Sequence, residues 1–137
     1  MKFLGTLLLT TFIVFSTQAN NKLEKNMKNI DKNFKAISKQ ISKVDKKEDS
    51  LKRIDTILES IQIAKEETPT TIEKMPTEKQ PEAQTKYKDY LEKLTEKTNE
   101  LKVAISSDNA DQSKALFKDI DQLKKEAHND FKKKKKK

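Results

Sequence analysis

Apolar residues recur every three or four positions along most of the chain, a spacing that places them on one face of an α-helix. The first stripe is unbroken and consists of Leu23, Met27, Ile30, Phe34, Ile37, Ile41 and Val44. Mostly Lys, Asn, Asp, Ser and Gln fill the positions between them. This pattern predicts an amphipathic helix over residues 21–45.

Three further stripes predict three further helices, over residues 49–67, 82–106 and 109–132. The stripes are Leu51, Ile54, Leu58 and Ile61, widened by Ile57 and Ala64; Tyr87, Leu91 (or Tyr90), Leu94, Thr98, Leu101 and Ile105; and Leu116, Phe117, Ile120, Leu123, Ala127 and Phe131.

Polar turns separate the predicted helices. Residues 46–50 form a charged turn that can cap the following helix, and residues 106–109 offer further cap candidates. All three prolines lie within residues 68–81, which predicts a long polar connection without a helix. Two short connections and one long one favour an all-α, antiparallel up-down-up-down four-helix bundle. The alternative is an extended coiled coil, but the heptads stop at each turn and no run is long enough for one.

The first 19 residues have the pattern of an export signal. Lys2 precedes an apolar stretch from Phe3 to Phe15, and the small residues Thr17 and Ala19 follow it. A basic start, a short apolar stretch and a small-x-small end are typical of a secretory signal peptide. A membrane anchor is the alternative, but it would need roughly 20 apolar residues. We therefore expect cleavage after Ala19 and an exported, soluble mature chain.

Composition excludes several classes of protein. The only glycine is Gly5, and the chain has no cysteine. Phosphate-binding loops, dinucleotide-binding turns and nucleophile elbows all need glycine, so nucleotide-binding and hydrolase α/β folds are excluded. Without cysteine there is no disulfide, thiolate metal site or covalent haem attachment. We expect no enzymatic activity.

The net charge of +8 is concentrated in a tail. Residues 132–137 are all lysine, and without them and Lys2 the chain has 23 basic against 22 acidic residues. A body so close to neutral does not indicate a nucleic-acid-binding protein. The tail is either a solvated extension or a weak docking element for an acidic redox partner or an anionic surface.

Met27 and His128 are the candidate ligands of a cofactor, and His128 is the only histidine in the chain. Each has a plain structural explanation, since methionine fills cores and histidine complements the end of a helix. In the predicted bundle, however, the start of the first helix and the end of the last one meet. A thioether and an imidazole opposed at that end would suit the two axial positions of a haem iron.

Two stretches resemble known sequences. Residues 23–37, LEKNMKNIDKNFKAI, resemble the first mature helix of the cytochrome b562 family, which consists of periplasmic haem proteins. Residues 124–132, KKEAHNDFK, resemble the end of its last helix, where a histidine precedes an aromatic residue by three positions. The Thr68-Pro69 junction and the proline-containing loop are also similar. The resemblance extends over the mature chain, closely at the two ends and loosely between them.

The resemblance implies one non-covalent b-type haem in the bundle, residues 20–131, with Met27 and His128 as its axial ligands. Lys124 stands where the family often has an arginine, and it would approach a haem propionate as a point charge. The aromatic wall of the haem site maps either to Tyr87 with Leu91 or to Tyr90 with Leu94.

We therefore expect a monomeric periplasmic electron-transfer protein whose redox partner is unknown. With both axial positions filled, no iron position is left for oxygen or a substrate. The alternative is a haem-free exported bundle that binds a partner or an anionic surface through charged faces or the lysine tail.

Overall fold

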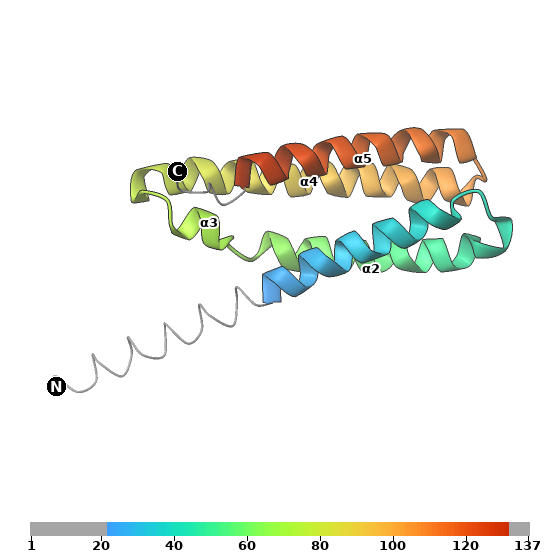
Figure 1. Ribbon diagram of the computed structural model, residues 1–137, viewed down its shortest axis with the longest axis horizontal. Helices are drawn as coiled ribbons and strands as arrows, with labels where there is room; N and C mark the ends of the chain where they lie inside the picture. The colour runs from blue at the N-terminus through green and yellow to red at the C-terminus, as the bar shows by residue number, and fades with distance from the viewer. Residues whose placement is uncertain (1–21, 132–137) are drawn as a thin grey trace, which may run out of the picture.

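The computed structural model describes residues 22–131, and this part of the chain contains helices and connections but no β-strand. Residues 22–40 are helical and form what we call the first helix. The elements after it, shown in Figure 1, are η1 (Val44–Lys46), α2 (Lys47–Lys65), α3 (Thr70–Glu73), η2 (Thr77–Lys79), α4 (Gln80–Ser106) and α5 (Ala110–Phe131). The expected signal peptide and lysine tail lie outside the described residues.

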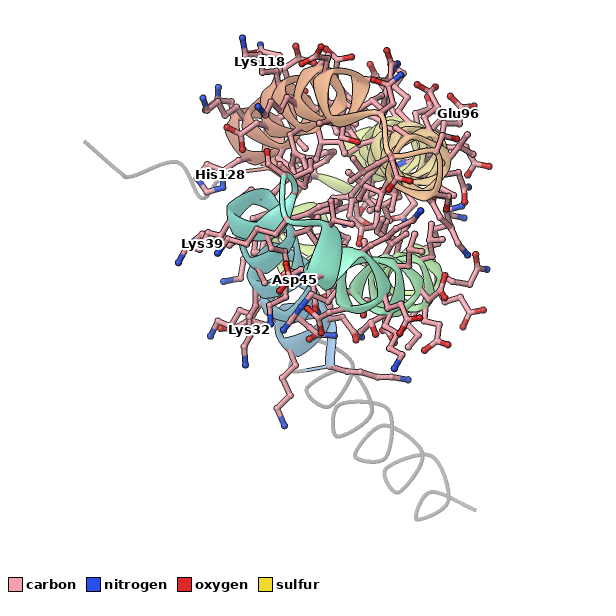
Figure 2. The ribbon with its side chains drawn as sticks, turned by 90° about the vertical axis from the view of Figure 1, so that its right-hand side faces the viewer. Lys32, Lys39, Asp45, Glu96, Lys118 and His128 are labelled. Atoms are coloured by element: carbon pink, nitrogen blue, oxygen red, sulfur yellow. The ribbon has the colours of Figure 1, made fainter. Side chains whose placement is uncertain are left out.

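The four long helices form an antiparallel bundle. In Figure 1 the first helix and α2 make one pair, and α4 and α5 make the other. Figure 2 looks along the bundle and shows the first helix next to both α2 and α5. The start of the first helix and the end of α5 lie at the same end of the bundle (Figure 1). The expected all-α four-helix bundle is confirmed.

Isoleucine and leucine side chains from all four helices fill the interior. Ile37, Ile54, Ile57 and Leu101 are completely buried, with an exposed fraction of 0% each. Burying one such side chain stabilises the fold by about 1.5–3 kcal/mol. Thr98 occupies a core position as well, and its hydroxyl donates a hydrogen bond to the carbonyl oxygen of Leu94 at 2.6 Å. The hydroxyl is thereby satisfied, which explains how a polar residue fits the apolar stripe.

The first helix ends at residue 40, five residues earlier than the apolar pattern predicts. Val44 continues the heptad spacing but lies in η1 with 83% of its surface exposed. The Gln40 side-chain amide donates hydrogen bonds to Asp49 Oδ2 at 2.7 Å and to Ser50 Oγ at 2.9 Å. These bonds connect the end of the first helix to the first turn of α2. The chain therefore turns before Val44 can reach the core.

The connection between α2 and α4 is more helical than the prolines suggest, so the expectation of a connection without a helix is wrong. α3 forms a single helical turn after Pro69, and it buries Ile72, which is 1% exposed. α4 begins at Gln80 and includes Pro81 in its first turn. A proline is tolerated there because the first turn of a helix leaves its N–H groups unpaired. Pro69 and Pro81 thus precede or begin helices.

The turn between α4 and α5 places Asp108 in the left-handed region, with φ of 56°. The Asp108 N–H donates to the carbonyl of Ile105 at 3.1 Å, and the Asn109 N–H donates to that of Ala104 at 2.9 Å. This pair of bonds is a Schellman motif, whose left-handed position usually holds glycine. Asn109 then caps α5, because its Oδ1 accepts a hydrogen bond from the Gln112 N–H at 3.1 Å.

Asp108 provides a test of this turn. Because a β-branched side chain is poorly tolerated at positive φ, Asp108→Val is expected to lower the free energy of unfolding by about 1–3 kcal/mol. Asp108→Asn removes the same exposed ion pair to Lys47 but keeps a residue that tolerates this conformation, so it is expected to change stability by about 0.5 kcal/mol at most. Urea unfolding measures both. Equal stability of the two variants would contradict the strain at this position.

Candidate functional site

A cleft opens at the end of the bundle where the first helix begins and α5 ends. The first helix, the start of α3, the first half of α4 and the last turns of α5 line it. Its volume is about 1210 Å³. Sites for small molecules and cofactors usually have roughly 300–1,000 Å³, so a large flat ligand can enter.

Met27 and His128 both line this cleft. Met27 is 40% exposed although it belongs to the apolar stripe of the first helix, whereas its stripe neighbours Leu23 and Ile30 are 8% and 2% exposed. Its thioether is therefore accessible at the edge of the core. His128 is exposed on the last turn of α5, and Figure 2 shows it extending from the body of the bundle. The structure thus brings the two candidate ligands to one cleft from neighbouring helices.

α4 supplies an apolar wall for the cleft. Tyr87, Leu91 and Leu94 are 5%, 3% and 6% exposed, and all of them line the cleft together with Tyr90. The sequence offered Tyr87 with Leu91 and Tyr90 with Leu94 as alternatives, but the helix presents both pairs. The Tyr87 hydroxyl donates a hydrogen bond to the carbonyl oxygen of Ala64 at 2.9 Å. Burial raises the pKa of Tyr87 well above its usual value, so the phenol stays neutral.

An aromatic cluster holds the last turn of α5 against α4. The Phe131 ring packs edge-on between Tyr87 and Tyr90, with centroids 5.8 Å and 5.9 Å away. The Tyr90 hydroxyl donates a hydrogen bond to Asp130, and Lys86 Nζ lies 3.1 Å from Asp130 Oδ2. Because His128 lies on the same turn, these contacts fix the segment that carries the imidazole.

The same contacts shift the pKa values of their ionisable groups. The hydrogen bond to Asp130, with burial and the carboxylate charge, raises the pKa of Tyr90 to about 12. Hydrogen bonds from Tyr90 and then Lys86 hold the pKa of Asp130 below its usual value. Because the folded-state pKa of Asp130 is lowered, these contacts are fully present at neutral pH and are lost only as the pH falls through that lowered value.

Lys124 lines the cleft but already has a partner. Its ammonium forms an ion pair with Asp31 of the first helix and lies 5.6 Å from the centroid of the Phe34 ring. Phe34 in turn packs edge-on against Phe117 at 6.3 Å. A haem propionate would therefore have to compete with the Asp31 carboxylate for the Lys124 ammonium. Asp31 was not among the residues singled out from the sequence, although its position one helical turn after Met27 places it on the same side of the helix.

The residues present fit a haem. Met27 would offer a thioether and His128 an imidazole to the iron of a haem in this cleft. The apolar wall suits a porphyrin face. Lys124 and Lys125, which form ion pairs with Asp31 and Asp121, lie at the cleft where propionates would need cations. Thr71 lines the cleft too, and its buried hydroxyl oxygen has no partner in the described chain. By contrast, residues 22–131 contain no cluster of three or more His, Cys, Asp or Glu that could hold a free metal ion.

A family model described as cytochrome b562 matches residues 22–132, which include the whole described bundle. No curated protein and no solved structure matches the chain. None of the helices in the described part of the chain has the length and apolar content that a membrane span requires.

Proposed function

The chain belongs to the cytochrome b562 family, a family of small haem-binding electron carriers and not of enzymes, and we propose that this member holds one non-covalent b-type haem between Met27 and His128. The observation that carries the proposal is that the only histidine and the one half-exposed methionine of the bundle line the same cleft. Neither side chain is needed to fill the core.

The bound haem would supply a one-electron couple between ferric and ferrous iron. The chain would hold the haem through the Met27 thioether and the His128 imidazole, and two protein ligands would leave no site on the iron for oxygen or a substrate. A Met27 thioether on the iron would stabilise the positive charge of the ferric state less than a second imidazole would, and this would favour the reduced state. Tyr87, Leu91 and Leu94 exclude water from one side of the cleft, which lowers the local dielectric constant.

We further propose that the chain is exported to the periplasm and acts there as a monomer with a protein redox partner. The amino-acid pattern of residues 1–19 supports export. The lysine tail, residues 132–137, follows the end of α5 in the sequence and could contact an acidic partner or anionic surface. Both segments lie outside the described residues, so these proposals rest on the sequence.

The cofactor proposal is tested by titrating the mature chain, residues 20–137, with haemin. We expect saturation at one haem per chain and sharp low-spin b-type bands after reduction. Saturation should also stabilise the fold, by about 2.7 kcal/mol when free haem is at 100 times its dissociation constant. If the chain binds no haem, or if binding continues to rise without reaching saturation, the proposal is contradicted and a haem-free bundle is favoured.

A further inference from the structure

Residues 22–131 have a net charge close to zero, but their charged residues are unevenly distributed among the helices. The first helix carries six lysines against Glu24 and Asp31, a net charge of +4. The described chain as a whole has 23 basic and 22 acidic residues, so everything outside the first helix has a net charge of −3. α2 and α4 are each balanced. The positive charge of the bundle is therefore a property of one helix.

Five of these lysines form one continuous surface, which we call the lysine face: Lys25, Lys28, Lys32, Lys35 and Lys39. They recur at spacings of three and four residues, all are exposed, and they lie opposite the buried Ile30, Phe34 and Ile37. Figure 2 shows Lys32 and Lys39 extending away from the bundle on the same side. At 1.5 Å per residue the face is about 21 Å long.

The lysine face is not neutralised within the molecule. Lys28 pairs with Glu24 at 2.8 Å, but no carboxylate of the described chain pairs with Lys25, Lys32, Lys35 or Lys39. Asp31, the other acidic residue of this helix, forms its ion pair with Lys124 of α5 instead. Lysines of the other helices more often have partners, as in the ion pairs Lys65–Glu92, Lys86–Asp130 and Lys102–Asp55. Like charges three and four residues apart destabilise a helix, and among the described residues the Lys28–Glu24 pair is the one ion pair of the lysine face that offsets this cost.

We propose that the lysine face is the docking surface for an acidic protein that exchanges electrons with the cleft. The face lies on the helix that carries Met27, so a protein docked there is separated from the cleft by one helix, a diameter of about 10 Å. Complementary charge would steer the encounter without the large apolar contact of a permanent complex. That the partner is a redox protein rests on the proposed function, whereas the binding itself does not require haem.

A protein partner fits this surface better than a membrane or a nucleic acid does. A helix that lies on a membrane inserts an apolar face into the lipid, but the apolar face of the first helix is buried in the bundle. Nucleic-acid-binding surfaces usually combine several arginines or stacking aromatics with lysine, and the lysine face has neither. A narrow row of lysines on a rigid helix matches a row of carboxylates on another folded surface.

The test compares two triple variants of the full mature chain with equal changes in net charge. Lys32→Glu/Lys35→Glu/Lys39→Glu reverses the lysine face. Lys88→Glu/Lys114→Glu/Lys118→Glu reverses three exposed lysines of α4 and α5 that also have no ion pair in the described chain. The probe is an acidic plant-type ferredoxin, and the association rate is measured at low salt by stopped flow. Circular dichroism checks that both variants keep their helix content.

We expect the association rate to fall at least tenfold in the first variant and by less than threefold in the second, with the difference shrinking as salt is raised above about 0.15 M. An equal fall in both variants would show that only net charge matters and would overturn the proposal. Binding to phosphatidylserine vesicles or duplex DNA without binding to the acidic protein would overturn it too. Measuring the haem-free chain alongside the haem-loaded one keeps this result separate from the question of haem binding.

Discussion

His128→Ala is expected to remove the low-spin spectrum of the haem-loaded protein and to weaken haem binding by about 100-fold or more, because no second histidine can replace the lost imidazole. Met27→Ala is expected to remove the low-spin bands as well, because an alanine cannot reach the iron. Its haem would keep the His128 bond, so the loss of affinity should be smaller.

The two effects are read from the reduced optical spectrum and from haemin titrations. Matched controls come from the same chain. Met75→Ala changes a methionine in the connection before η2, outside the cleft, and Gln122→Ala changes an exposed residue of α5 that hydrogen-bonds Glu126. Both controls should keep the wild-type spectrum. Unchanged spectra in the Met27 and His128 variants would show that other side chains ligate the iron.

Met27→His is expected to keep a low-spin haem but to lower its reduction potential. A second imidazole stabilises ferric iron more than a thioether does, and the axial ligands set haem potentials over a range of roughly 0.8 V. A fall on the order of 0.1 V or more is therefore expected. Met27 is 40% exposed at the edge of the cleft, so a polar imidazole ring can take its place without disturbing the core.

A spectroelectrochemical titration measures this potential. The free energy of unfolding of the haem-free variant serves as the control, and it should stay close to that of the wild type because position 27 contributes little to the core. A potential that does not move would mean that Met27 is not bound to iron in the wild-type protein.

The apolar spacing was sufficient to predict the bundle, because the interior is built from residues that recur on one face of each helix. Ile54, Ile57 and Ile61 are all buried, as their stripe predicts. The same spacing was wrong at Val44, since nothing in a heptad shows where the chain will turn. That point is set by the hydrogen bonds of Gln40 to α2, which depend on how two helices meet.

The candidate site was predictable only where its residues are chemically distinctive. Met27 and His128 could be singled out because such residues are rare in this chain, and the bundle topology places them at one end. Asp31 could not be identified in the same way. Its ion pair with Lys124 joins two helices far apart in the sequence, and it depends on how each helix is rotated about its axis. Which side of α4 faces the cleft depends on the same rotation.

The near-neutral charge of the body shows a similar limit. A count of charged residues is enough to separate the basic tail from the near-neutral bundle. The total cannot show, however, that the first helix alone has a net charge of +4. The lysine face becomes visible only when the buried side of the first helix is known, because that side fixes which lysines point outward. The position of a charge, more than its total, determines which surface a partner can recognise.

The central claim, that Met27 binds the haem iron, is tested most directly by NMR of the reduced, haem-loaded mature chain with isotope-labelled methionine methyl groups. Met27 and Met75 are the two methionines of the mature chain. The porphyrin ring current should shift the Met27 methyl signal far upfield and leave that of Met75 in the usual region, and Met27→Leu should remove the shifted signal. If both methyl signals stay in the usual region at haem saturation, Met27 is not an axial ligand.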